Sequence, residues 1–265
     1  MIDVQNVTKR YGQKTVLDAV SLRIQPRAVT AFIGPNGAGK STLLSIICRL
    51  VPKDGGEVWI DGKEISQYRP FELARKLSIL RQTNHLPIRL TVRDLVAFGR
   101  FPHSRGRLTR EDQRHVDAAI RYTGLEDLQD KYLDQLSGGQ RQRAFIAMVL
   151  AQDTPYVFLD EPLNNLDMKH AVHTMQLLRR LVDDLGKTVA VVLHDINLAA
   201  SYADRIVAFK DGRLIREGTT EEMVRSDVLR QVFDMEIPVA ELEGCKFCIY
   251  FGNVPAFKKG SGGVG

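Results

Sequence analysis

Three absences narrow the possibilities before any motif is considered. The chain of 265 residues has only three cysteines, too few for a disulfide framework. No apolar run approaches the roughly 20 residues that a transmembrane helix needs. The start, Met1-Ile2-Asp3-Val4, lacks a basic segment followed by an apolar one, so we expect no signal peptide. We therefore expect the chain to stay in the cytoplasm and to reach any membrane through a partner.

A strong excess of charge is also missing. The net charge of +5 comes from 37 basic and 32 acidic residues, a mild imbalance that permits contact with an anionic surface without requiring nucleic acid. The length allows one large domain or two subdomains. Cys48 lies in an apolar helical stretch and is expected in the core. Cys245 and Cys248 form a C-x-x-C without two further ligands nearby, so we interpret them as an incidental pair rather than a metal or redox site.

One glycine-rich stretch has a clear chemical meaning. It reads Gly34-Pro35-Asn36-Gly37-Ala38-Gly39-Lys40-Ser41 and fits the pattern G-x-x-x-x-G-K-[ST] of phosphate-binding loops. A β-rich apolar run precedes it and a helix-compatible run follows it. Unpaired N–H groups at a helix start attract anions, Lys40 adds a charge for the β- and γ-phosphates, and Ser41 can bind Mg²⁺. The stretch therefore predicts a nucleotide site.

Two later stretches supply the remaining parts of a hydrolytic site. Residues 156–159 form an apolar run that ends in Asp160 and Glu161, the Walker B arrangement. Asp160 can hold Mg²⁺, and Glu161 can polarise the attacking water. His194 follows another buried run, at the strand end where α/β sheets bind ligands, and could hydrogen-bond a γ-phosphate. Tyr11 is either an ordinary strand-end aromatic or a stacking platform for a nucleobase.

The pattern of apolar residues predicts a mixed α/β chain. Residues 2–33 predict an antiparallel sheet leading to the loop, residues 57–60 and 206–217 predict hairpins, and residues 77–80 predict a strand. Residues 84–136 carry helical periodicity and indicate an inserted helical subdomain. Ser137-Gly138-Gly139-Gln140 fits a capping box at the start of the next helix, and its exposed N–H groups make a second anion site.

The ordered set of motifs resembles the ATP-binding cassette (ABC) ATPases up to about residue 251. The phosphate loop, Leu136-Ser137-Gly138-Gly139-Gln140, the Walker B run and His194 follow one another as they do in that family. The resemblance implies an α/β P-loop NTPase cassette with a RecA-like core, an antiparallel β subdomain and an inserted α-helical subdomain. It implies one domain over 1–251, with core and β subdomain at 1–83 and 154–251, the helical subdomain at 84–153, and a flexible tail at 252–265.

The resemblance also implies a role for each matching residue. Tyr11 is similar to the aromatic that stacks on adenine, Gln82 to the Q-loop residue that reaches Mg²⁺ and the lytic water, and Asp167 to the D-loop acid. Glu161 is similar to the catalytic base, Asp160 to the Mg²⁺ carboxylate, and His194 to the switch histidine. The ATP-binding positions are Gly34, Pro35, Asn36, Gly37, Ala38, Gly39, Lys40, Ser41, Thr42, Ser137, Gly138, Gly139 and Gln140.

The partners follow from the same resemblance. Two copies are expected to pair head to tail. The turn Ser137–Gln140, which we call the signature turn, would cap the ATP held by the other copy. A membrane permease is expected to dock in a groove near Gln82 to His103, with Phe98, Arg100 and Phe101 as candidates. A periplasmic or surface substrate-binding protein would act indirectly, no nucleic acid is expected, and the subunit would lie peripherally on the cytoplasmic face of the inner membrane.

Two segments point to one branch of the family. They are Glu161-Pro162-Leu163-Asn164-Asn165-Leu166-Asp167, where many members have Ser-Ala in place of Asn164-Asn165, and His194-Asp195-Ile196-Asn197-Leu198-Ala199-Ala200. Both segments are similar to those of ATPase subunits that serve importers of iron siderophores, haem and vitamin B12. Among these substrates we favour a ferric siderophore. The alternatives are an exporter subunit, a soluble ABC ATPase acting on nucleic acid or ribosomes, and a phosphotransferase, which has no use for a second anion site.

Overall fold

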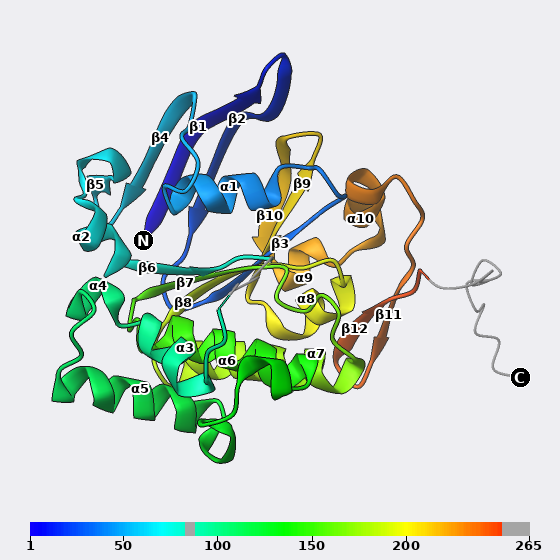
Figure 1. The fold of residues 1–265 in the computed structure, drawn as a ribbon. Helices are drawn as coiled ribbons and strands as arrows, with labels where there is room; N and C mark the ends of the chain where they lie inside the picture. The colour runs from blue at the N-terminus through cyan, green and yellow to red at the C-terminus, as the bar shows by residue number, and fades with distance from the viewer. Residues whose placement is uncertain (83–87, 251–265) are drawn as a thin grey trace, which may run out of the picture.

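The computed structural model describes residues 1–82 and 88–250 and contains two main sheets (Figure 1). The antiparallel sheet has the strand order β2 (Lys14–Ile24), β1 (Ile2–Tyr11), β4 (Gly55–Ile60) and β5 (Lys63–Glu64). The six-stranded sheet has the order β10 (Arg213–Thr219), β9 (Arg205–Lys210), β3 (Val29–Ile33), β8 (Thr188–Val192), β7 (Tyr156–Asp160) and β6 (Leu77–Leu80). Neighbouring strands of this second sheet are parallel except β10, which runs antiparallel to β9. A small hairpin joins β11 (Val239–Leu242) to β12 (Cys245–Cys248).

Helices cover both faces of the six-stranded sheet or pack on other helices. They are α1 (Lys40–Ile47), α2 (Pro70–Ala74), α3 (Val92–Phe98), α4 (Phe101–Ser104), α5 (Arg110–Tyr122), α6 (Gly138–Ala151), α7 (Met168–Asp183), α8 (Ile196–Tyr202), α9 (Thr220–Met223) and α10 (Ser226–Phe233). Short 3₁₀ turns lie at Ile65–Gln67, Glu126–Leu128 and Leu133–Gln135. No helix among the described residues combines the length and apolarity that crossing a membrane requires.

The central strands are apolar at nearly every position because both of their faces are covered. Strands β3, β7 and β8 are buried throughout, as expected for strands inside a parallel sheet. Successive side chains alternate between two cores. Phe32 packs with α1 and the antiparallel sheet, whereas Ala31 and Ile33 pack with α6, α7 and α8. The sheet is therefore a rigid middle layer whose strand ends can hold a site.

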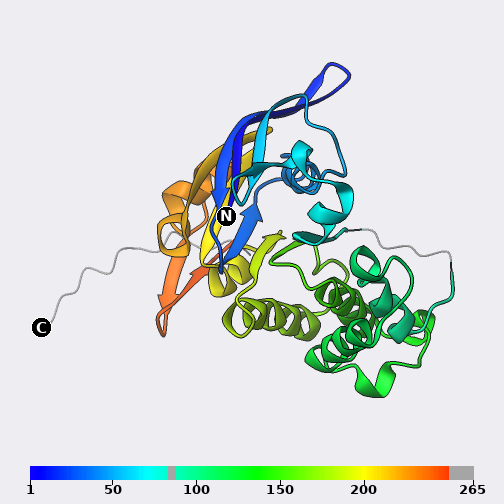
Figure 2. The same cartoon turned by 90° about the vertical axis from the view of Figure 1, so that its left-hand side faces the viewer.

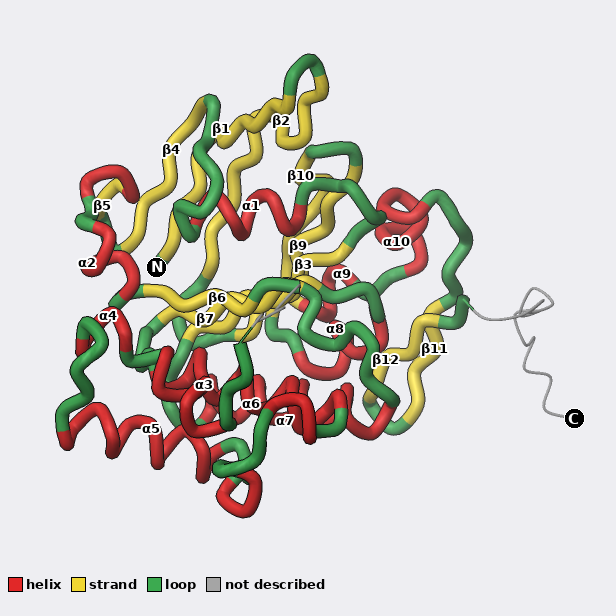
Figure 3. The backbone as a smooth tube through the Cα atoms, viewed as in Figure 1, coloured by secondary structure: helices red, strands yellow, loops and turns green. Residues whose placement is uncertain are grey.

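The figures show how this layering divides the molecule. In Figure 1, α1 lies between the two sheets, and α3, α5, α6 and α7 lie below the six-stranded sheet. Figure 3 separates a strand-rich upper half from a helix-rich lower half. The turned view in Figure 2 shows the green segment, which contains α3, α5 and α6, lying to one side of the sheets. The helix-rich segment expected between the strands at 77–80 and 156–160 is thus present.

One expectation for the N-terminal part is wrong. Strands β1 and β2 form the expected antiparallel pair, but Val29–Ile33 leaves that sheet and enters the parallel one between β8 and β9. The reason is the lack of alternation in this strand, which is buried at all five positions and needs cover on both faces. The expected flexible tail at 252–265 lies outside the described residues.

Candidate nucleotide site

The phosphate-binding loop lies between β3 and the start of α1. Gly34 has a φ of 136°, and a Cβ there would lie 2.0 Å from the Phe209 carbonyl oxygen. Gly39 has a φ of 98°, and a Cβ there would lie 2.6 Å from a Leu17 methyl group. Both positions combine a left-handed backbone with a close approach of neighbouring chain, so only glycine fits. This packing gives the loop the tight curl that directs its N–H groups inward.

Lys40 is folded back over the loop. Its side chain is nearly buried, and its Nζ atom donates hydrogen bonds to the carbonyl oxygens of Gly34 at 2.7 Å and Pro35 at 2.9 Å. Burial lowers the pKa of Lys40, and the negative charges of Glu161 and Asp160 oppose that effect. The loop thus holds a cation over its own centre, where a phosphate oxygen would replace carbonyl oxygens as the acceptor.

The end of β7 meets the start of α1 at a hydroxyl–carboxylate pair. Ser41 Oγ donates to Asp160 Oδ1 at 2.6 Å. Burial and the neighbouring Glu161 raise the pKa of Asp160, while the hydrogen bond from Ser41 and the charges of Arg81 and Lys40 lower it. A hydroxyl and a carboxylate are hard oxygen ligands of the kind that Mg²⁺ takes together with phosphate oxygens and waters. These two residues therefore fit a magnesium ion bound with a nucleotide.

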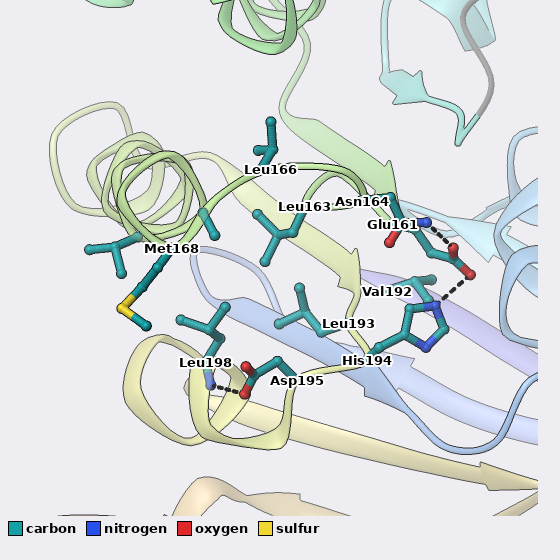
Figure 4. Close-up of a pocket in the computed structure, with 12 residues that line it drawn as sticks. Glu161, Leu163, Asn164, Leu166, Met168, Val192, Leu193, His194, Asp195 and Leu198 are labelled. Carbon is teal, nitrogen blue, oxygen red and sulfur yellow. Dashed lines mark hydrogen bonds and ion pairs between the residues drawn. The ribbon is translucent and has the colours of Figure 1, made fainter. Parts of the chain in front are cut away.

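Glu161 is surrounded by three donors from three segments. Its Oε2 atom accepts from Gln82 Nε2 at 2.6 Å and from Asn164 Nδ2 at 2.6 Å, and its Oε1 atom lies 2.9 Å from His194 Nε2. Figure 4 shows Asn164 and His194 pointing at this carboxylate. Glu161 itself has a φ of 52°, an unusual conformation for this residue type and one typical of functional sites.

Strand order explains why these groups meet. Gln82 follows β6, Glu161 follows β7 and His194 follows β8, and these three strands are neighbours in the sheet. Parallel strands end at the same edge, so the three side chains reach one place from distant parts of the chain. The structure therefore brings Gln82, Glu161 and His194 together as the sequence predicts. Asn164 is an addition, since no local pattern indicated that its amide contacts Glu161.

Two cavities border this edge of the sheet. One, of about 210 Å³, is lined by Lys14, Val16, Asn36, Gly37, Ala38, Gly39, Lys40, Ser41, Thr42 and Glu161. The other, of about 330 Å³, has Glu161 and His194 at one side and an otherwise largely apolar lining that includes Leu163, Leu166, Met168, Val172 and Leu198 (Figure 4). The first is the better nucleotide site because its backbone N–H groups and Lys40 match a phosphate. Lys14 and Val16 were not predicted, and only their place after the Gly12 turn could have suggested them.

Tyr11 stands apart from the phosphate cavity. It is the last residue of β1, is about half exposed, and lies outside the residues that line the cavity. The Lys9 ammonium lies 5.3 Å from its ring centroid. An exposed ring at a strand end is compatible with base stacking, so its role stays a prediction.

The signature turn forms the predicted capping box at the start of α6. Ser137 Oγ accepts from the Gln140 N–H at 3.3 Å, and Gln140 Oε1 accepts from the Ser137 N–H at 3.0 Å. Among the described residues, no hydrogen bond or ion pair joins this turn to the phosphate loop. Asp167, which resembles the D-loop acid, is the N-cap of α7 and accepts a hydrogen bond from the His170 N–H at 2.8 Å. The two candidate anion sites thus remain separate within one chain.

The surface expected to receive a permease is partly corrected. Phe98 and Phe101 are about half exposed, but Arg100 is buried and its Nε atom donates to Asp112 at 2.9 Å. Arg100 is therefore a structural ion-pair residue and cannot contact a docking partner. A hollow of about 420 Å³ lies nearby, lined by residues of α2, β6 and the end of α1 together with Gln152. Residues 83–87 of the expected groove lie outside the described part of the chain.

The three cysteines lie in different surroundings. Cys48 is buried beside α1, and Cys245 and Cys248 are free thiols, exposed and buried respectively. Burial and the charge of Asp195 raise the pKa of the Cys248 thiol to about 11. No cluster of three or more His, Cys, Asp or Glu side chains suited to a metal occurs in the described ranges.

The comparisons with known proteins can now be added to this geometry. The family model described as "ABC transporter" matches residues 17–164, which include the phosphate loop, the signature turn and Glu161. The chain belongs to the ABC transporter family. Members of this family bind and hydrolyse ATP, and residues 17–164 of this chain match one copy of the family model.

Individual relatives within this family have names that describe a more specific function. The chain is 60% identical over 251 residues to the petrobactin import ATP-binding protein YclP of Bacillus subtilis, covering 95% of this chain and 100% of YclP. It is 48% identical over 239 residues to the petrobactin import ATP-binding protein FatE of Bacillus anthracis, covering 90% of this chain and 96% of FatE.

Solved structures agree with the fold. The dimeric structure of MJ0796, a bacterial ABC transporter cassette, has a TM-score of 0.74 and 36% identity, covering 83% of this chain and 99% of that chain. A second dimeric structure of MJ0796 is described as a post-hydrolysis state with ADP and Pi, with a TM-score of 0.73 and 35% identity over the same shares of the two chains. The ABC cassette fold of this chain is thereby confirmed.

Proposed function

We propose that this chain is the ATP-hydrolysing subunit of an importer for an iron(III)–siderophore chelate, with a petrobactin-type chelate favoured. The observation that carries the proposal is the near full-length likeness to YclP, a petrobactin import ATP-binding protein. The assembled edge of β6, β7 and β8 supports it, because it supplies a phosphate loop and a restrained carboxylate in one place. In this proposal the cargo passes through other subunits and touches no residue of this chain.

The side chains divide the work of hydrolysis. Lys40 and the N–H groups of the loop bind the β- and γ-phosphates, and Tyr11 stacks on the base. Glu161 accepts the proton of the attacking water, while Gln82 and His194 orient that water and the γ-phosphate. Ser41 and Asp160 would hold Mg²⁺, which when bound would neutralise charge on the phosphate oxygens. The contacts of Lys40, Ser41 and Glu161 described above support these assignments. The stacking of Tyr11 rests on its position in the sequence alone.

Two copies are proposed to work as a pair. The turn Ser137–Gln140 has no hydrogen bond or ion pair with the phosphate loop of its own chain, as far as the described residues show. In a head-to-tail pair each turn closes on the nucleotide held by the other copy, an isologous arrangement. The structures of MJ0796, both described as dimeric, support the pairing of two copies. ATP then joins the copies, and hydrolysis lets them separate, which changes the relative affinity of open and closed states.

The remaining parts of the proposal concern assembly. Residues 1–83 and 154–251 make the core with the β subdomain, and residues 84–153 make the helical subdomain. The permease docks against the hollow beside α2 and the exposed rings of Phe98 and Phe101. The subunit lies on the cytoplasmic face of the inner membrane, and a substrate-binding protein delivers the chelate to the permease. The apolar, exposed aromatic rings beside a hollow are the kind of surface that protein interfaces use.

The decisive experiment is the mass in solution of Glu161→Gln protein with and without Mg-ATP. We expect kcat to fall by about 10²-fold or more because a general base is lost, and a dimer to form only with ATP. Glu111→Gln, an exposed change on α5, is the matched control and should behave as the native chain. Undiminished hydrolysis by Glu161→Gln would remove Glu161 from its role. Uptake of ferric petrobactin by the subunit with its permease then tests the cargo, and transport of haem or vitamin B12 alone would contradict it.

A further inference from the structure

A histidine outside the motifs joins two parts of the cassette. His170 lies in the first turn of α7, and its Nδ1 atom is 2.7 Å from Asp167 Oδ1. The same carboxylate oxygen accepts the His170 backbone N–H at 2.8 Å. A carboxylate only accepts hydrogen bonds, so Nδ1 carries a proton and the ring has a fixed orientation. These hydrogen bonds, the backbone one first, lower the pKa of Asp167.

The other side of this ring fills the space beside the signature turn. A Cβ built on Gly139 would lie 1.9 Å from His170 Cδ2, 2.4 Å from Cγ and 2.7 Å from Nε2. The ring therefore occupies the volume that any side chain at position 139 would need. Gly139 is buried in the first turn of α6, so the contact between α6 and α7 here is close.

The loop before α7 also lies near the signature turn. A Cβ on Gly138 would have the Asn165 carbonyl oxygen as its nearest neighbour, at 3.9 Å. Asn164, one residue earlier, donates to Glu161 at 2.6 Å. The segment Glu161–Asp167 thus carries the Glu161 carboxylate at one end and meets the signature turn, through His170, at the other. A shift of this segment would therefore move both Glu161 and the signature turn.

We propose that His170 is a positioning residue that holds the signature turn Ser137–Gln140 against the segment Glu161–Asp167. The inference rests on the proposed function, because the turn meets a nucleotide only in the head-to-tail pair. In that pair the turn closes on the partner's nucleotide, while Glu161 acts on the nucleotide of its own chain. His170 then links the state of one hydrolytic site to closure of the other, a coupling between two sites.

The test separates the ring from its hydrogen bond. His170→Asn keeps an N–H donor for Asp167 but empties the space beside Gly139, whereas His170→Phe keeps a ring and loses the donor. His170→Ala loses both. His173→Ala is the matched control, because His173 is exposed and lies one turn further along α7. All variants are made in the full chain, both alone and combined with Glu161→Gln.

Two readouts distinguish positioning from a general structural effect. For His170→Ala we expect the affinity of the single chain for Mg-ATP to stay within about twofold, because the phosphate loop is untouched. We expect the protein concentration at half-dimerisation with ATP to rise at least about fivefold, the lower end of typical coupling between sites. For His170→Asn and His170→Phe, the concentration at half-dimerisation should lie between the values for the native chain and for His170→Ala. The dependence of hydrolysis on ATP concentration should become less cooperative in the variants.

Each contrary result has a definite meaning. Equal dimerisation by His170→Ala and His173→Ala overturns the inference while the proposed function stands. A matching loss of Mg-ATP affinity in the single chain also overturns it, because His170 would then be a general structural residue. Failure of Glu161→Gln to dimerise with His170 intact removes the sandwich pair itself, and the role of His170 with it.

Discussion

Lys40 shows how one buried charge prepares a site for an anion. Lys40 is only 4% exposed, and its ammonium group donates to two loop carbonyls. We expect Lys40→Ala to weaken nucleotide binding by about 2 kcal/mol, roughly thirtyfold in Kd, the value of a hydrogen bond to a charged group. Titration calorimetry with ATP measures this directly. Lys14→Ala, at the rim of the same cavity, is the comparison variant, and an effect as large as that of Lys40→Ala would contradict the central role of Lys40.

The buried pair Arg100–Asp112 predicts how stability changes in acid. Burial disfavours ionised Asp112, but hydrogen bonds from Thr109 and Arg100 outweigh this and lower its pKa from 3.8 to about 2. Because the folded pKa lies below the unfolded one, the stabilisation is complete above about pH 4 and is lost as the pH falls through about 2. We expect Asp112→Asn to lower the free energy of unfolding by about 3 kcal/mol near pH 6, and this difference to narrow towards pH 2.

Urea unfolding at a series of pH values measures this difference. The control is Asp117→Asn, which breaks the more exposed pair of Asp117 with Arg93 and should cost less than about 1 kcal/mol. A difference for Asp112→Asn that stays constant between pH 6 and pH 2 would show that the Asp112 carboxylate does not titrate as described.

Single residues also show which roles could be predicted from the sequence and which could not. The roles of Lys40, Ser41 and Asp160 were predictable because each belongs to a short motif with a fixed chemistry. Arg100 was placed on a docking surface because the family resemblance puts the permease groove near Gln82 to His103. Its actual partner, Asp112, lies on α5, and the packing of α5 against α3 brings the two side chains together. The contacts of Asn164 and His170 depend on tertiary packing in the same way.

At the scale of elements, the C-terminal hairpin is attached to the helix that follows His194. Asn197 in α8 accepts from the Cys248 N–H at 2.7 Å and donates to the Cys248 carbonyl at 3.2 Å, so its amide pairs with the strand as a neighbouring backbone would. We expect Asn197→Ala to expose Cys248 more often, because a buried N–H without a partner costs about 1–3 kcal/mol. Labelling of Cys248 by a thiol reagent should become about tenfold faster.

The same molecule contains the reference for that measurement. Cys245 is already exposed and should label at the same rate in both proteins. Ser201→Ala removes a different hydrogen bond of α8, the one from Ser201 Oγ to the Asn197 carbonyl, and controls for loosening of the helix. Unchanged labelling of Cys248 in Asn197→Ala would show that packing alone holds the hairpin.

Elements were predictable where local signals agreed. The strand at 77–80 and the strand ending at Asp160 are short apolar runs with clear limits, and the structure has both at those positions. The capping box at Ser137–Gln140 was equally clear. Val29–Ile33 was assigned to the wrong sheet because an apolar run indicates a strand without indicating its neighbours. Neighbours are chosen by long-range packing that no local window contains.

At the scale of the whole molecule, the exposed aromatic rings at the end of α3 and the start of α4 are the feature that a permease would use. Phe98 and Phe101 are 50% and 51% exposed, and the Phe101 ring lies 6.4 Å from that of Phe71. We expect the double change Phe98→Ala with Phe101→Ala to weaken permease binding at least about tenfold, as loss of interface anchors does, with little change in the ATP affinity of the free subunit. Co-purification with the permease and transport measure this.

Phe247→Ala is the matched control for the aromatic pair. Its ring is 42% exposed, and it lies on β12, at the opposite end of the molecule from α4 in Figure 1. Permease binding and transport that survive the double change would show that the docking surface lies elsewhere. Equal losses in Phe247→Ala would point to a loss of solubility rather than of a specific interface.

The strand order of the parallel sheet has a consequence for synthesis. Strand β3 carries the phosphate loop and leaves the ribosome early, but both of its neighbours, β8 and β9, come from the last third of the chain. Until residues 188–210 have been made, β3 has no partner for its backbone hydrogen bonds, and its apolar side chains lack half of their cover. A nascent chain that stops short of β8 therefore cannot present a formed phosphate loop. The first motif to be translated is among the last to become able to bind ATP.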